Sequence, residues 1–156
     1  MRLGTLATHQ IVGMGFAFEL AAREREEDMA RIGALRDRLW EGIRAIGDVE
    51  LNGHAQERVA VLLNVSFRGV EGESLQFALR ELAVSAGSAC SSASEEASYV
   101  LRALGHSDQL AQSSLRFSLG RFTTADQIDT AIAAVKREVT RLRSFSPQTI
   151  GSEKKS

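Results

Sequence analysis

The stretch SLRFSLGRFTTADQIDTAIAAVKREVTRL, residues 114–142, joins a short alternating segment to a strongly periodic one. Its first part, SLRFSL at 114–119, alternates polar and apolar residues, which is typical of a strand with one face in water. In the second part, Thr124 and Gln127 have the spacing of a capping box, which predicts that a helix begins there. Apolar residues then recur at helical spacing: Ile128, Ile132, Val135, Val139 and Leu142. The sequence therefore predicts a strand followed by an amphipathic helix.

Upstream of this stretch, helical and strand patterns alternate. HQIVGMGFAFEL at 9–20 is apolar almost all round, which predicts a buried helix, and an amphipathic helix at about 25–46 is expected to end at Gly47. The other predicted elements are strands at 49–52, at 62–67 and in the short run after 82, and helices at 71–81 and 95–104.

Three local details accompany these elements. We expect the first two strands to pair antiparallel, Gly72 to loosen the start of the helix at 71–81, and Ser92 or Ser94 to cap the helix at 95–104. The order helix, strand, strand, helix, strand, helix, strand, helix predicts helices packed on a mostly antiparallel sheet, an α+β fold.

Composition limits the classes of function. The chain has 156 residues, 44% of them hydrophobic, which is enough for the core of one ordinary domain. Nineteen basic and twenty acidic residues give a formal charge of -1, so we expect no nucleic-acid or membrane binding by bulk electrostatics. No apolar run approaches the roughly 18 residues typical of a membrane span. No signal-peptide pattern is present, and a single cysteine fits a reducing compartment, so a cytoplasmic location is expected.

The single cysteine, Cys90, lies in SAGSACSSAS at 85–94, where every other residue is Ser, Ala or Gly. Such a segment buries little apolar area against the entropy lost on ordering it, which favours a mobile, accessible loop and a nucleophilic role for the thiol. A buried structural cysteine in a small-residue packing site is an equally good interpretation.

Other candidate residues are few. The histidines His9, His54 and His106 stand in no recognisable motif, so surface or capping roles are the better interpretation. One cysteine and scattered histidines lack the paired spacing of zinc ligands, and no metal site is predicted. Arg116 is expected on the wetter face of its strand, where its guanidinium can hold a carboxylate through two hydrogen bonds. From the residues alone, an ordinary solvated strand arginine is the slightly favoured interpretation.

Several stretches in the right order resemble one family, the cysteine desulfurases of the NifS/IscS type: VEGES at 70–74, SAGSACSSAS at 85–94, SYVLRALG at 98–105 and SSLRFSLGRFTT at 113–124. The likeness begins at RLGT and HQIVGMG near the start and continues to about Pro147. It covers nearly all of this chain but only the last part of a full-length member. The resemblance implies the C-terminal small domain of a fold-type I transferase that depends on pyridoxal phosphate.

The resemblance also implies a reaction and residue roles. The family uses pyridoxal phosphate to take sulfur from L-cysteine, leaving alanine and a persulfide on its own cysteine, which passes the sulfur on for iron–sulfur clusters or tRNA thiolation. By this resemblance Cys90 is the sulfur acceptor, Arg116 holds the substrate carboxylate, and Thr5 reaches across a dimer interface to the cofactor phosphate of the other subunit. The implied partners are L-cysteine, an iron–sulfur scaffold or other sulfur-acceptor proteins, and a second subunit or a complementing N-terminal chain.

The chain departs from the family pattern at the cofactor. The family's Schiff-base lysine, its cofactor-stacking histidine and its aspartate partner for the pyridine nitrogen precede the part that matches. The three lysines present lie on the exposed side of the last helix or in the tail: Lys136, Lys154 and Lys155. We therefore expect that the chain does not hold pyridoxal phosphate alone. Leu3 in RLGT replaces a serine of the family pattern, which puts the local phosphate contact in doubt.

These observations predict three segments: 1–24 as a remnant of the large cofactor-binding domain, 25–145 as the small C-terminal domain, and 146–156 as a disordered tail. The predicted function is the sulfur-accepting part of a cysteine desulfurase, inactive until a cofactor-binding portion is supplied. A non-catalytic sulfur carrier or interaction module is the alternative, and a degraded or incomplete gene product is a third. The apolar helix at 9–20 would expose a surface that invites dimerisation, aggregation or a complementing chain.

Overall fold

The computed structural model describes residues 6–86 and 98–145. Its elements in chain order are α1 (Thr8–Arg44), β1 (Val49–Leu51), β2 (Leu62–Phe67), α2 (Gly72–Ala78), β3 (Ser85–Ala86), α3 (Tyr99–Ala103), α4 (Asp108–Gln112), β4 (Ser114–Ser118) and α5 (Ala125–Phe145). The four strands form one sheet in the order β1-β2-β4-β3, and every neighbouring pair is antiparallel. The predicted α+β fold and the antiparallel pairing of the first two strands are confirmed.

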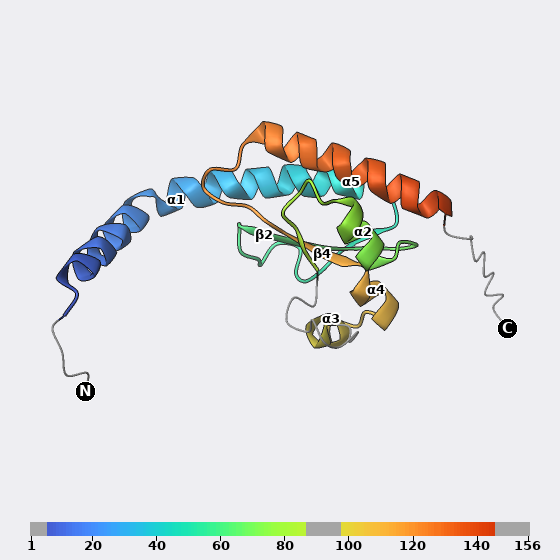
Figure 1. Ribbon diagram of the computed structural model, residues 1–156, viewed down its shortest axis with the longest axis horizontal. Helices are drawn as coiled ribbons and strands as arrows, with labels where there is room; N and C mark the ends of the chain where they lie inside the picture. The colour runs from blue at the N-terminus through green and yellow to red at the C-terminus, as the bar shows by residue number, and fades with distance from the viewer. Residues whose placement is uncertain (1–5, 87–97, 146–156) are drawn as a thin grey trace.

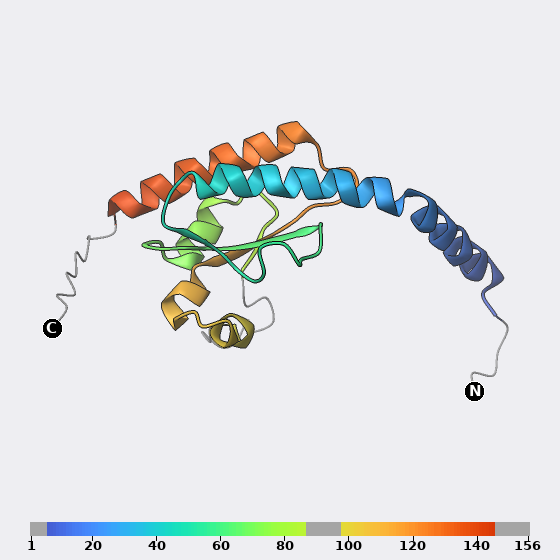
Figure 2. The same cartoon turned by 180° about the vertical axis from the view of Figure 1, so that it is seen from behind.

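The two long helices cover one face of this sheet. Figures 1 and 2 show α1 and α5 side by side along it, with the short helices α3 and α4 on the opposite side. Alternate strand residues point to the two faces, so Leu63, Val65 and Phe67 of β2 are buried with Leu115 and Phe117 of β4. Buried helix residues complete the core: Ile32, Leu39, Ile43, Ile128, Val135 and Val139. Burial of each such side chain contributes about 1.5–3 kcal/mol to folding.

The first helix differs from the prediction in length and burial. The residues ELAAREREED at 19–28 are mostly good helix formers, so the two expected helices join into α1, 37 residues long. The boundary predicted at residue 24 lies inside this helix, and the division into two segments stays a prediction. The N-terminal half of α1 projects beyond the sheet (Figure 1), and its side chains are exposed, with Val12 at 71%, Phe16 at 63% and Phe18 at 70%. The helix at 9–20 forms, but nothing in the described chain buries it, so the exposed apolar surface that was expected here is confirmed.

The last helix begins as its sequence predicts. The backbone N–H of Thr124 donates to Oε1 of Gln127 at 3.0 Å, and the N–H of Gln127 donates to Oγ1 of Thr124 at 3.3 Å. This reciprocal pair satisfies two amide groups that a helix start otherwise leaves open. The capping box is therefore confirmed, and α5 runs on to Phe145.

The remaining elements agree in place and differ in detail. The helix expected at 95–104 appears as α3 from Tyr99, while its suggested caps Ser92 and Ser94 lie outside the described residues, as does the tail from 146. Helix α4 was not predicted, although Ser107 caps it by accepting from the N–H of Leu110 at 3.3 Å. Within the described ranges no helix is long and apolar enough to span a membrane.

Candidate functional site

Of the three residues predicted for the site, the structure places one. Arg116 lies in the middle of β4 and is exposed, on the sheet face away from α1 and α5. Cys90 and Thr5 lie outside the described residues. In the sequence, Cys90 follows Ala86, the last residue of β3, by four positions. The geometry of the site is therefore built on Arg116 and its neighbours in the sheet.

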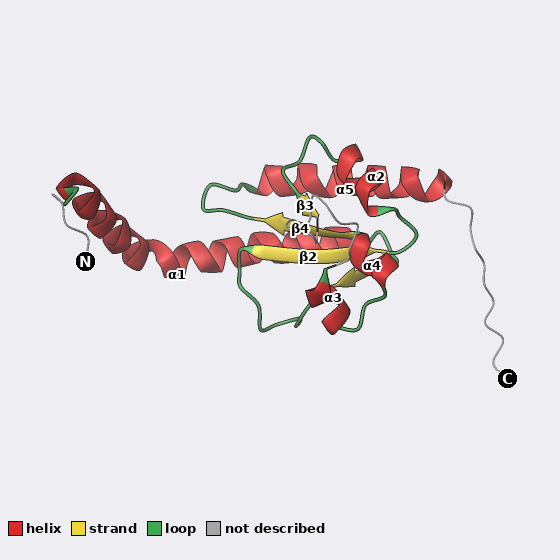
Figure 3. Cartoon of the chain, turned by 60° about the horizontal axis from the view of Figure 1, so that its bottom comes forward, coloured by secondary structure: helices red, strands yellow, loops and turns green. Residues whose placement is uncertain are grey.

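Arg116 belongs to a row of polar residues that runs across β3, β4 and β2 to the residue that follows β1. Its Cα partners are Asn64 on β2 and Ser85 on β3, and Asn64 in turn faces Asn52, which follows β1 and donates its backbone N–H to Asn64 O at 3.0 Å. Figure 3 looks toward this face of the sheet, with β2, β4 and β3 in front of the long helices. We name Asn52, Asn64, Arg116 and Ser85 the polar row.

One end of the polar row is held by a buried hydrogen-bond network. Nδ2 of Asn52 donates to Oδ1 of Asn64 at 2.7 Å and to Oγ of Ser66 at 2.9 Å, and the Ser66 hydroxyl donates to Oδ1 of Asn52 at 3.3 Å. Asn52 is 6% exposed and Ser66 is fully buried. Because buried polar groups are costly to leave unpaired, this network keeps the amide of Asn64 in one orientation.

The other part of the polar row is open to solvent. Among the described residues, Arg116 makes no hydrogen bond and no ion pair, whereas most arginines near the sheet and on α5 are engaged, for example Arg68 with Glu50 and Arg137 with Glu81. A guanidinium presents its donors in a planar fork that matches a carboxylate. Arg116 therefore lies on the wetter face of its strand, as expected, and within the described ranges its guanidinium has no partner.

The histidines take structural positions. Nδ1 of His54 accepts from the backbone N–H groups of Gln56 at 3.2 Å and Glu57 at 2.8 Å, so it holds the loop between β1 and β2, in keeping with the expected surface or capping role. Nδ1 of His106 lies 3.5 Å from Oε2 of Glu50, and His9 is exposed on α1. No group of three metal-binding side chains occurs within residues 6–86 and 98–145.

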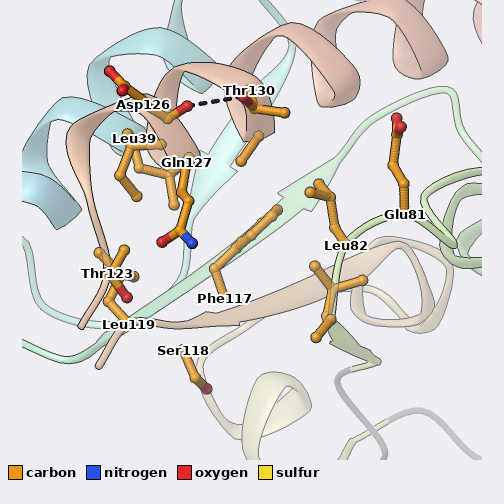
Figure 4. Close-up of a pocket in the computed structure, with 14 residues that line it drawn as sticks. Leu39, Glu81, Leu82, Phe117, Ser118, Leu119, Thr123, Asp126, Gln127 and Thr130 are labelled. Carbon is orange, nitrogen blue, oxygen red and sulfur yellow. Dashed lines mark hydrogen bonds between the residues drawn. The ribbon is translucent and has the colours of Figure 1, made fainter. Parts of the chain in front are cut away.

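A pocket of about 500 Å³ lies on the opposite face of β4 from Arg116. Figure 4 shows Phe117 at its centre, between Leu82 and Gln127, with Leu39 and Asp126 on the helix side. The polar groups around it serve local structure: the Thr130 hydroxyl donates to Asp126 O at 2.8 Å (Figure 4), and Gln127 belongs to the capping box.

This pocket does not fit the pyridoxal phosphate expected from the resemblance. Its lining contains the carboxylates of Glu81 and Asp126 but neither a lysine for a Schiff base nor an arginine for a phosphate. Lys136, the only lysine among the described residues, is exposed on α5 and does not line it. The groups that line this pocket therefore do not suit the cofactor.

Sequence reasoning missed Asn64, which pairs with Arg116, and Ser66, which helps to hold the Asn64 side chain through Asn52. Asn64 and Ser66 alternate with apolar residues in LLNVSF, and this alternation was the available signal that they share the wetter face of the strand. The register that places Asn64 opposite Arg116 comes only from the folded sheet.

Comparison with known proteins gives consistent results. The family model described as aminotransferase class-V matches residues 1–130. Proteins named cysteine desulfurase IscS are similar over 147 residues, with 60% identity for those of Shewanella baltica (strain OS155) and Salmonella schwarzengrund (strain CVM19633) and 58% for that of Enterobacter sp. (strain 638). The match covers 94% of this chain and 36% of each relative, so the chain spans about a third of their length.

Solved structures show the same relationship. A NifS-like protein superposes with a TM-score of 0.74 at 26% identity, covering 90% of this chain and 36% of that one. The NifS-like protein from Rickettsia africae has the same fold, with a TM-score of 0.73 at 22% identity over 89% of this chain and 36% of its own. DndA from Streptomyces lividans matches with a TM-score of 0.52 at 30% identity, over 75% of this chain and 33% of its own.

Proposed function

This chain belongs to the aminotransferase class-V family, and from that membership we propose that it is the C-terminal, sulfur-accepting part of a cysteine desulfurase. Its contribution is the nucleophilic thiol and the binding of the substrate carboxylate. The cofactor chemistry belongs to polypeptide outside these 156 residues. The sulfur serves iron–sulfur cluster assembly or tRNA thiolation through acceptor proteins.

Cys90 is the proposed acceptor of the sulfur. The net change is that L-cysteine and the Cys90 thiol become alanine and a Cys90 persulfide, so one sulfur atom moves and no outside oxidant or reductant is needed. The segment that carries Cys90 begins where β3 ends, and Ser85 of β3 faces Arg116 across the sheet. This direct connection in the chain between Ser85 of the polar row and Cys90 supports Cys90 as the sulfur acceptor, because the nucleophile and the substrate must meet at one site.

Arg116 is the proposed binding group for the substrate carboxylate. Its exposure, its lack of a partner among the described residues and its place in a row of neutral polar side chains all favour this role. This open arginine opposite Ser85, the residue that leads toward Cys90, is the single observation that carries the proposal. Thr5 is proposed to contact the cofactor phosphate held mainly by another subunit.

The cofactor and its lysine are proposed to come from a complementing polypeptide. The pocket beside Phe117 lacks the lysine and arginine that the cofactor needs, and the exposed apolar half of α1 offers a surface on which such a polypeptide can pack. An apolar surface of this kind marks a place where another protein binds. A homodimer of the completed enzyme would then bring Thr5 of one subunit to the cofactor of the other.

Complementation tests this function. The chain is co-expressed with the cofactor-binding portion of a relative such as the Salmonella protein, and the purified pair is given L-cysteine. We expect alanine release and a mass increase of one sulfur atom on Cys90, both lost in Cys90→Ser. Arg116→Leu should raise the KM for L-cysteine strongly while the persulfide still forms at saturating substrate. A pair that assembles but never forms a persulfide contradicts the proposal.

The same experiment separates the enzyme part from a non-catalytic sulfur carrier. A carrier would accept sulfur on Cys90 from a separate persulfide donor in the absence of pyridoxal phosphate and of the complementing portion. Transfer under those conditions, together with no alanine production in the assembled pair, would favour the carrier.

A further inference from the structure

We propose that Asn64 is a second binding group for the substrate carboxylate, acting beside Arg116. The inference rests on the proposed function, because it extends the site built on Arg116. It adds a neutral donor that selects substrates with a free carboxylate over the corresponding amides. Three features of the sheet carry it: the kind of strand pair that Asn64 and Arg116 form, the orientation of the Asn64 amide, and the charges around them.

Asn64 and Arg116 form a non-hydrogen-bonded pair of the antiparallel ladder. The N–H of Leu119 donates to Val61 O at 2.8 Å, and the N–H of Phe67 donates to Ser113 O at 3.2 Å. In an antiparallel ladder, opposite residues alternate between pairs that exchange backbone hydrogen bonds and pairs that do not. Counting along the register from these two bonds makes Asn64 and Arg116 a pair that does not. Side chains of such pairs lie closest, with Cβ atoms about 4.5–5.5 Å apart. Both side chains can therefore contact the same small anion.

The Asn64 amide has its acceptor and its donor on different sides. Oδ1 accepts from Nδ2 of Asn52, which lies on the β1 side of Asn64. Because the amide is planar, its NH₂ group is on the other side of the Cβ–Cγ bond, the side of β4 and Arg116. Among the described residues no acceptor takes this NH₂ group. The buried partners Asn52 and Ser66 hold the orientation, so the donor is set in place before a ligand binds.

The surrounding charges favour a carboxylate at this place. An ionised carboxylate has about four lone-pair sites, and a guanidinium fork uses two of them. The amide of Asn64 can take a third without adding charge. Among the described residues, Glu50 of β1 lies on this face opposite Ser66, two positions along β2 from Asn64, and it is already paired with Arg68 and contacted by His106. Its repulsion of an incoming anion is therefore reduced.

The direct test is a titration of the full 156-residue chain followed by NMR. L-cysteine is the probe, and L-cysteinamide, which has no carboxylate, is the control ligand. We expect the side-chain NH₂ signals of Asn64 and the Nε–H signal of Arg116 to shift with L-cysteine and not with L-cysteinamide. In Asn64→Asp, which keeps the shape and turns the donor into a repelling carboxylate, the affinity for L-cysteine should fall about tenfold or more, since hydrogen bonds to charged groups are the strong ones.

Ser118→Asp is the matched control. It adds the same charge on the same exposed face of the sheet, but on β4, two residues from Arg116. It should change the affinity for L-cysteine by about twofold or less, because the exposed charge is screened. In the complemented pair, Asn64→Asp should also reduce the preference for L-cysteine over L-cysteinamide, a ratio that a merely structural defect does not move. A shift of Arg116 without a shift of Asn64, or equal binding by Asn64→Asp and the unchanged chain, overturns this inference alone. Normal shifts with no persulfide on complementation would instead overturn the proposed function.

Discussion

The backbone carbonyl of Gln112 occupies the space into which a Cβ atom on Gly72 would project. Gly72 is the first residue of α2, and Gln112 is the last of α4, so the close approach joins two elements far apart in the sequence. The loosening of the helix start by Gly72 stays a prediction, and the structure adds a steric reason for a glycine at this place. The glycine is required because any side chain there meets rigid backbone.

Gly72→Ala should lower the free energy of unfolding by about 1–3 kcal/mol, the usual cost of overpacking, because backbone must shift to admit the methyl group. Urea unfolding monitored by circular dichroism measures the change. Gly120→Ala is the control, since a Cβ at Gly120 meets nothing within 4 Å, and it should be nearly neutral. Equal stabilities of the two variants would contradict the close packing of α2 against α4.

Thr124→Ala should remove the cap of α5 and cost about 0.5–2 kcal/mol. The variant loses the hydroxyl that accepts from the N–H of Gln127. Thr140→Ala, at an exposed interior position of the same helix, should be neutral or slightly stabilising, because alanine is the better helix former. Thermal unfolding of both variants checks the difference, and a stable Thr124→Ala would argue against the capping box.

The Glu138 carboxyl on α5 contributes to the stability of the fold, and this contribution depends on pH. Its hydrogen bonds from Arg137 at 2.8 Å and Arg141 at 2.7 Å lower the pKa of the Glu138 carboxyl below its ordinary value, about 4.3. A lowered folded-state pKa stabilises the fold fully above the ordinary value, and this contribution is lost as the pH falls through the lowered pKa. Glu138→Gln should therefore lower the urea midpoint near neutral pH, and its difference from the unchanged chain should shrink at low pH.

Glu26→Gln serves as the control for that series. Glu26 is exposed on α1, and within the described residues it takes part in no ion pair. Its substitution should leave the midpoint nearly unchanged at both pH values, as surface charges contribute little. If the difference in urea midpoint between Glu138→Gln and the unchanged chain stays constant with pH, the ion pairs of Glu138 are not the cause of that difference.

The N-terminal half of α1 should make the isolated chain associate. Phe16 and Phe18 are 63% and 70% exposed within a continuous apolar segment. We expect binding of a hydrophobic dye and concentration-dependent association, both reduced by Phe16→Glu with Phe18→Glu. Phe77→Glu, at another exposed phenylalanine on α2, should change neither. A chain that stays monomeric at high concentration and binds no dye would contradict this expectation and weaken the proposed packing surface.

The sequence patterns predicted correctly those features that depend on residues close together in the chain. The capping box of α5 involves residues three apart, and the alternation in SLRFSL needs only neighbours, so both could be read before the fold was known. The break expected between the first two helices failed because high helix propensity through 19–28 outweighed the change of pattern. The short helix α4 was missed because five residues carry little periodicity.

The α+β class, the start of the last helix and the likeness to the cysteine desulfurases could all be predicted from residue patterns along the chain. The pairing of Asn64 with Arg116 and the close approach of Gln112 to Gly72 could not, and they appear first in the folded protein. Strand register and helix contacts form because distant segments bury one common core, and the spacing of these segments in the sequence does not reveal how close they come in space.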